Sequence, residues 1–70
     1  MNRPLDLLDK NKDKIVYIEM KNSRIIRGKL QAFDLHLNLW VEEAVAVDDK
    51  ETKLGSVFIR GDEVSIISVV

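Results

Sequence analysis

The stretches GKLQAFDLHLNL, residues 28–39, and IRGD, residues 59–62, decide how this chain folds. Each begins as an apolar, β-like run and ends in polar or charged side chains that can hold a flat ligand. At such strand ends the side chains leave the core and the backbone must turn. The two stretches therefore predict a binding site as well as a fold.

The chain has 70 residues and no cysteine, so we expect one small domain over residues 1–70 with a single core. Without disulfides or thiolate metal ligands, self-association is the expected source of extra stability. The 11 Lys and Arg residues nearly balance the 12 Asp and Glu residues. A broad grip on duplex phosphates is therefore not expected, and any nucleic-acid binding must be local.

The apolar runs of the sequence are only a few residues long. They fall far short of the roughly 20 residues that span a bilayer. The opening MNRP shows no signal-peptide pattern. We therefore expect a soluble, cytoplasmic protein with no membrane contact.

Hydrophobic periodicity predicts a short helix followed by about five strands. Pro4 suits a first helical turn, and Leu5, Leu7 and Leu8 form an apolar stripe that should pack on the open end of a sheet. Beyond Lys14, apolar and polar residues alternate. The expected strands cover residues 14–21, 26–32, 37–47, 55–60 and 64–69, with turns at 22–23 and 34–36, a polar loop at 48–53 and a tight two-residue turn at 61–62.

Gly28 stands in the middle of the second expected strand and predicts a sharp bend there. The expected fold class is mainly β: a short N-terminal helix and a five-stranded, strongly bent antiparallel small barrel, SH3-like or OB-like. The last strands are apolar on both faces at 57–59, 66–67 and 69–70. A monomer would leave such edges wet and prone to uncontrolled pairing, so we expect them to be buried between subunits.

These residues resemble the Sm and like-Sm (Lsm) family, most closely its archaeal branch. The resemblance covers essentially the whole chain. The first family motif is carried by Gly28, Leu30, Phe33-Asp34 and Leu37-Asn38-Leu39, with His36 at the position used for stacking, and the second by Ile59-Arg60-Gly61-Asp62. The chain departs from the family at Leu37, where Met is usual, and at Trp40, where a smaller aliphatic residue is usual. The second motif also differs from the Tyr-Lys-His type of the bacterial host-factor relative, Hfq.

The resemblance implies a ring, commonly seven-membered, in which the fourth strand of one subunit pairs with the fifth strand of the next. It also implies a pore that binds single-stranded, uridine-rich RNA. The function implied is that of a ribonucleoprotein scaffold or chaperone in RNA processing. Self-association into a homoheptamer and contact with other RNA-processing proteins follow from the same resemblance.

A base in a single strand offers a flat face and a hydrogen-bonding edge. His36 and Arg60 can sandwich the face. The Asn38 amide can pair with uracil by presenting its carbonyl to the ring N–H and its NH2 to a carbonyl. In isolation, His36 could equally be a packed or turn residue.

Three neighbours complete the predicted RNA site. Asp34 is expected to fix the orientation of the Asn38 amide, and capping of the local turn is an equally open role for it. Asp62 is expected to accept a hydrogen bond from Asn38 or from a ribose hydroxyl. Gly61 is expected to serve mainly as a turn residue with positive φ.

Other functions are less well supported by the sequence. Asp34 and His36 could form an acid–base pair, but Cys is absent, neither motif holds a Ser, and a lone His offers no metal cluster. We therefore expect no catalysis, no cofactor and no metal, and we interpret the acidic residues at 48–51 as a solvated loop. The alternative is an SH3-like barrel for Pro-rich peptides, but such grooves need several aromatic residues. Trp40 is expected to pack rather than to stack on a ligand.

Overall fold

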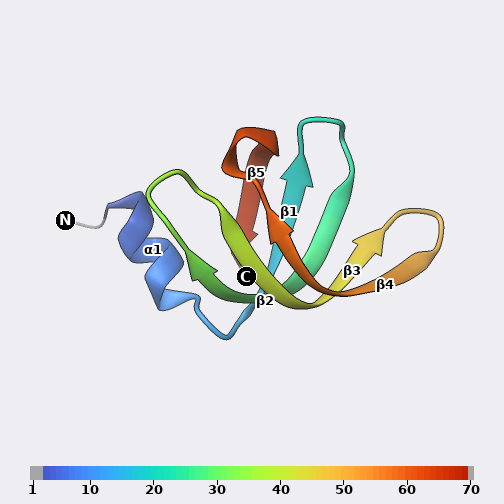
Figure 1. Ribbon diagram of the computed structural model, residues 1–70, viewed down its shortest axis with the longest axis horizontal. Coiled ribbons are helices and arrows are strands. Elements are labelled where there is room, and N and C mark those ends of the chain that lie inside the picture. The colour runs from blue at the N-terminus through green and yellow to red at the C-terminus, as the bar shows by residue number, and fades with distance from the viewer. Residues whose placement is uncertain (1–2, 70) are drawn as a thin grey trace.

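One helix precedes a strongly bent antiparallel sheet in the computed structural model, which describes residues 3–69 (Figure 1). The opening Met1-Asn2 and the final Val70, which belongs to the last apolar pair, lie outside the described residues. The elements are α1 (Pro4–Lys10), β1 (Ile15–Met20), β2 (Ile25–Phe33), β3 (Leu39–Val47), β4 (Glu51–Ile59), a 3-10 turn (Gly61–Glu63) and β5 (Val64–Val69). The mainly β fold predicted from the sequence is confirmed.

The strands follow the order β4-β3-β2-β1-β5, and each neighbouring pair is antiparallel. Strands β4 and β5 are therefore the two edges of the sheet. Both edges carry exposed apolar side chains: Phe58 of β4 is 61% exposed and Ile66 of β5 is 52% exposed. Each edge thus has an unpaired backbone and apolar side chains to offer to another chain.

Alternation along the strands builds the core. Val16 and Ile18 of β1, Leu30 of β2, and Leu39 and Val41 of β3 are fully buried. Because side chains of a strand point to opposite faces in turn, the residues between them face outward. The outward row includes Trp40, a large aromatic side chain that the core does not absorb.

The sheet bends within the pairing of β2 with β3. The pairing of these strands shifts register between Arg27 and Lys29, on either side of Gly28. A Cβ at Gly28 would overlap the Val41 side chain and lie 3.2 Å from the Ala44 Cα. Gly28 therefore allows a close approach of two backbones, in agreement with the bend expected there.

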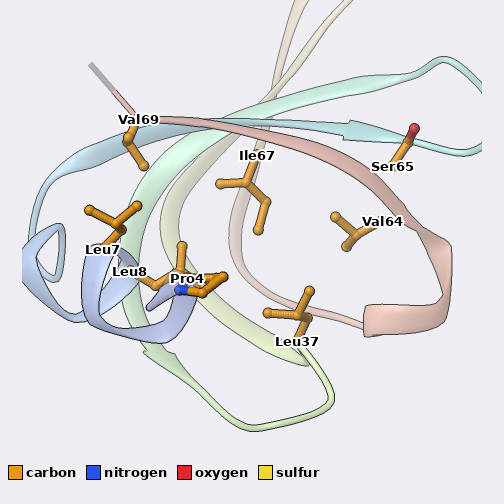
Figure 2. A pocket seen from close by; sticks show the side chains of 8 residues that line it. All are labelled: Pro4, Leu7, Leu8, Leu37, Val64, Ser65, Ile67 and Val69. Atoms are coloured by element: carbon orange, nitrogen blue, oxygen red, sulfur yellow. The ribbon is translucent and has the colours of Figure 1, made fainter. Parts of the chain in front are cut away.

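Helix α1 lies at the opposite end of the molecule from the β3–β4 hairpin tip (Figure 1). Its first turn is closed by Asp6, whose carboxylate accepts a hydrogen bond from the Arg3 N–H at 3.1 Å. Leu8 enters the core as expected, but Leu7 is 45% exposed. Leu7 instead borders an apolar groove of about 280 Å³ between α1 and β5, where Leu7, Ile67 and Val69 face one another (Figure 2).

The starts of two strands and the form of one turn differ from the prediction. Strand β3 begins at Leu39 because Leu37 has φ +61 and belongs to the preceding turn. Strand β4 begins at Glu51 because the hairpin continues to pair beyond the core, with Glu51 opposite Val47. Its first residues are polar because both of their faces meet solvent. The expected two-residue turn at 61–62 is instead a 3-10 turn over Gly61–Glu63.

Candidate functional site

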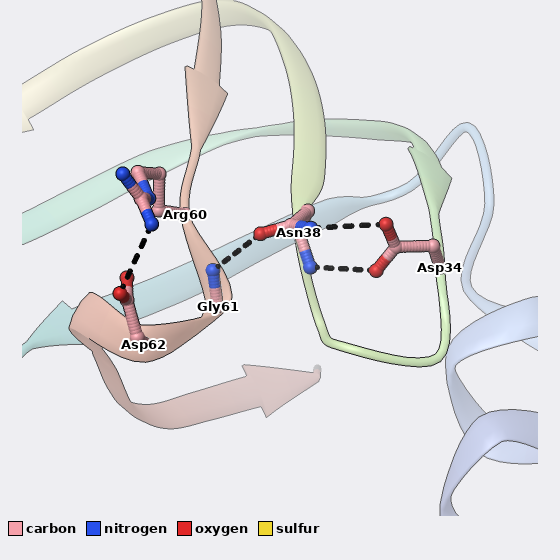
Figure 3. A network of polar contacts seen from close by, with 5 residues as sticks. All are labelled: Asp34, Asn38, Arg60, Gly61 and Asp62. Carbon is pink, nitrogen blue, oxygen red and sulfur yellow. Dashed lines mark hydrogen bonds and ion pairs between the residues drawn. The ribbon is translucent and has the colours of Figure 1, made fainter.

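The two motif stretches, residues 28–39 and 59–62, meet at turns that touch each other. One turn connects β2 to β3 through residues 34–38, and the other connects β4 to β5 through residues 60–63. The Gly61 N–H donates a hydrogen bond of 2.8 Å to Asn38 Oδ1 (Figure 3). This contact brings the predicted site residues of both motifs to one place.

Asp34 holds the first turn together. Its Oδ1 accepts hydrogen bonds from the backbone N–H groups of His36, at 2.9 Å, and Asn38, at 3.0 Å. Its Oδ2 accepts a third from Asn38 Nδ2 at 3.0 Å (Figure 3). The side-chain bond from Asn38 is the largest cause of a pKa of Asp34 below its usual value, and the two backbone bonds act in the same direction. Asp34 thus caps the turn and also holds the Asn38 side chain.

The orientation of the Asn38 amide is decided by its two neighbours. A backbone N–H can only donate and an ionised carboxylate can only accept. The oxygen must therefore face Gly61 and the nitrogen must face Asp34. One amide hydrogen and one oxygen lone pair of Asn38 stay available for a ligand, and together they form a donor and acceptor pair of fixed order.

Gly61 is required by space rather than by φ. The expectation of positive φ is wrong, because the backbone of Gly61 lies outside the left-handed region. A Cβ on Gly61 would overlap the carbonyl oxygen of His36 and lie 2.8 Å from the carbonyl carbon of Leu37. Its backbone N–H, which bonds to Asn38, is a site component that the sequence reasoning missed, and no local sequence signal could have found it.

Arg60 and Asp62 lie on the other side of Gly61. Arg60 Nη2 is 3.3 Å from Asp62 Oδ2 in a solvent-exposed ion pair (Figure 3). Exposed pairs of this kind contribute little to stability, so the guanidinium can exchange its partner at small cost. Among the described residues, Asp62 pairs with Arg60 and not with Asn38, one of its two expected partners; contact with a ribose hydroxyl stays a prediction.

Five of the six predicted residues line one open depression of about 440 Å³: His36, Asn38, Arg60, Gly61 and Asp62. Asp34, the sixth, holds the Asn38 amide. The depression combines an imidazole and a guanidinium, both flat groups that can stack on a base, with an amide edge. Within residues 3–69, no group of three His, Cys, Asp or Glu side chains could hold a metal ion.

A second depression of about 200 Å³ adjoins the first. It is lined by Ala32, Phe33, Asp34, Asn38, Trp40 and Phe58. Trp40, predicted to pack rather than to stack on a ligand, lines this depression with 39% of its surface exposed. The alternation of the sequence indicates the outward orientation of Trp40, because Trp40 stands between the buried Leu39 and Val41 and must face away from the core.

Comparison with known proteins shows the family of the chain. The family model of the LSM domain matches residues 6–69. The chain is 44% identical to an Sm-like protein of Methanococcoides burtonii, over 96% of each chain. Across the described helices, none is long and apolar enough to cross a membrane.

Solved structures give the same result at the level of the fold. The P. aerophilum SmAP1 heptamer matches with a TM-score of 0.94 and 34% identity, over 100% of this chain and 96% of that one. The Sm protein of Pyrococcus abyssii in complex with a uridine heptamer matches with a TM-score of 0.89 and 38% identity, over 96% and 97% of the two chains. By sequence and by fold, this chain belongs to the Sm-like (LSM) family.

Proposed function

We propose that this chain, as one Sm-like domain over residues 1–70, forms a homoheptameric ring that holds single-stranded, uridine-rich RNA at its pore. In this role it serves in the cytoplasm as a ribonucleoprotein scaffold or chaperone in RNA processing, alongside other RNA-processing proteins and without a catalytic step of its own. The observation that carries the proposal is the Asn38 amide, which Asp34 and Gly61 hold in one orientation.

The fixed amide favours uracil over adenine. Its free lone pair can accept the ring N–H of uracil, and its free hydrogen can donate to a uracil carbonyl. Adenine does not offer that order of donor and acceptor. His36 and Arg60 border the same depression and supply flat faces for stacking. A relative with 38% identity was solved with a uridine heptamer, which supports the same class of ligand for this chain.

The ring is supported by the two free edges of the sheet. Strands β4 and β5 end the strand order, and pairing β4 of one copy with β5 of the next continues the sheet between subunits. Such a contact is heterologous, and it closes a ring when the rotation between copies allows. Relatives with 34% and 37% identity were solved as heptamers, which supports seven subunits here.

A ring also explains how a chain with net charge −1 holds a polyanion. One stacked base contributes only about 1–3 kcal/mol. Several pockets on one ring meet successive nucleotides of the same strand at an effective concentration on the millimolar scale. The Arg60 side chains of all subunits would add a local positive field at the pore.

The test is native mass spectrometry of the full chain with and without heptauridine, together with titrations of heptauridine, hepta-adenosine and a proline-rich peptide. We expect a seven-subunit ring that binds one heptauridine and discriminates against adenosine. A soluble monomer at micromolar concentration would overturn the ring. Binding of the peptide but of neither oligonucleotide would favour the protein-interaction barrel instead.

The assembly has its own matched pair of variants. Ile66→Asp places a charge on the β5 edge and should dissociate the ring, because the carboxylate would be buried at the subunit contact. Leu35→Asp makes the same change at a residue that is 79% exposed in the 34–38 turn and belongs to neither edge strand. It should leave the subunit count unchanged.

A further inference from the structure

Trp40 and Phe58 form an aromatic surface on the outer face of the sheet. The two residues lie opposite each other in the β3–β4 pairing, and Ala32 of β2 lies opposite Trp40 on the other side. In the single chain, Trp40 is 39% exposed and Phe58 is 61% exposed. A cross-strand aromatic pair alone stabilises a sheet modestly, and that role does not require exposure.

This surface continues the uridine site. Asn38 lines the depression that contains His36 and Arg60, and it also lines the one that contains Trp40 and Phe58. Asp34, which holds the Asn38 amide, borders the second depression too. An RNA strand whose base is held by the Asn38 amide can therefore continue directly into the depression that Trp40 lines.

The chemistry of the second depression fits a base better than a phosphate or a peptide. Asp34 lines the depression, and Glu42 contacts Trp40. Both side chains carry carboxylates, which repel phosphate. The Trp40 indole N–H already donates to Glu42 Oε2 at 3.4 Å, so the flat face of the indole is the part left for a ligand. The volume of about 200 Å³ is below the roughly 300–1,000 Å³ typical of pockets for larger ligands and suits one flat ring.

Trp40 also stays accessible in the proposed ring. It lies on β3, one strand in from the β4 edge, so backbone pairing of β4 with a neighbouring copy does not occupy its strand. We propose that Trp40 is a stacking subsite for the nucleotide that flanks the uridine held by Asn38, whereas Phe58 lies on the β4 edge that pairs with the next copy. The inference rests on the proposed function. It predicts little base specificity at the flanking position, because every base has a π face.

The experiment uses Trp40 as its own probe, since it is the only Trp of the chain. Heptauridine is compared with the same strand extended by three adenosines at its 5′ or 3′ end, by Trp fluorescence and by calorimetry. We expect one extended strand to quench Trp40 and to bind at least about fivefold more tightly than heptauridine, the lower end of one stacked base.

The variants separate stacking from stability. Trp40→Val should remove the gain from the extension and leave heptauridine affinity unchanged, whereas Trp40→Phe should keep most of the gain. Tyr17→Leu is the matched control, because Tyr17 is 38% exposed on β1 and lies one strand in from the β5 edge. It should keep the full gain. Thermal unfolding of each variant checks that the ring is intact.

The outcomes distinguish the two proposals. If heptauridine binds but both extensions leave fluorescence and affinity unchanged, the subsite is wrong and the proposed function stands. If the extension gain survives Trp40→Val, the added nucleotides bind elsewhere and the subsite is also wrong. Quenching that depends on protein concentration without RNA would assign the surface to contact between rings. Failure to bind heptauridine overturns the proposed function together with this inference.

Discussion

Asn38 Oδ1 and the Gly61 N–H form a hydrogen bond of 2.8 Å that joins two turns 23 residues apart. The bond is partly buried and ties the end of the β2–β3 turn to the start of the 3-10 turn. The Asn38 amide, which we propose recognises the base, therefore also stabilises the fold. Changes at either residue should therefore alter both ligand preference and stability.

Asn38→Ala should flatten the preference for uridine over adenosine by about 1–3 kcal/mol, the discrimination typical of a two-point contact to a base edge. It should also lower the free energy of unfolding by about 1 kcal/mol, because the Gly61 N–H loses its partner. Paired titrations with heptauridine and hepta-adenosine measure the first effect.

Asn22→Ala is the control for the Asn38 variant. Asn22 Oδ1 also accepts a backbone N–H, that of Arg24 at 3.0 Å, in a turn outside the site. It should leave the uridine preference intact. An equal loss of affinity for both oligonucleotides in Asn38→Ala would mean that Asn38 is a structural residue only.

Gly61→Ala should destabilise the fold by about 1–3 kcal/mol, because the new methyl group overlaps the His36 carbonyl and the turns must separate. Separation breaks the bond to Asn38, so uridine binding should weaken in the same variant. Gly55→Ala is the comparison. Gly55 has φ +79 and open space around its Cβ position, so the substitution strains the backbone without touching the site. Equal uridine affinity in Gly61→Ala and the wild type would contradict the packing argument.

Asp34 should give the protein an acid-sensitive component of stability. Its pKa is lowered in the fold, first by the Asn38 side-chain bond. A carboxyl group with a lowered folded pKa stabilises the fold fully above its unfolded pKa of about 3.9, and this contribution is lost as the pH falls through the folded pKa. Urea unfolding from pH 7 to pH 2 measures the change.

Asp34→Asn should be less stable than the wild type at pH 7, and its stability should fall less steeply below about pH 4. Asp49→Asn, in the loop between β3 and β4, makes the same change of charge outside the site. It should retain the wild-type slope. Parallel acid profiles for Asp34→Asn and the wild type would show that the hydrogen bonds of Asp34 are not what stabilises the turn.

Arg60→Ala should weaken oligouridine binding at every length and most strongly for strands that circle the pore, because the loss repeats in each subunit. The dependence of affinity on salt should also decrease, since a cation near the RNA is removed. Calorimetry with strands of three to nine uridines at two salt concentrations tests both effects. Equal affinity for a trinucleotide and a heptanucleotide in the wild type would rule out the multivalent pore.

Sequence patterns predicted the approximate position of every strand, and the alternation predicted the inward residues of β1 and β3 together with Leu30 of β2. Val16, Ile18 and Leu30 alternate with polar residues, and all three are buried as expected. This succeeds because a strand repeats every two residues and the core needs one face of it. The boundaries were harder to predict: Leu37 belongs to a turn with positive φ, and the polar start of β4 pairs beyond the core.

How the two motifs meet depends on the tertiary fold. The sequence predicted His36, Asn38 and Arg60 at strand ends, but it also predicted a positive φ at Gly61 and left Asp62 to accept from either Asn38 or a ribose hydroxyl. In the fold, Gly61 is needed because the His36 carbonyl lies against it, and its N–H holds the Asn38 oxygen. A contact between turns 23 residues apart depends on the curvature of the whole sheet, whereas local sequence patterns describe only the residues beside one another.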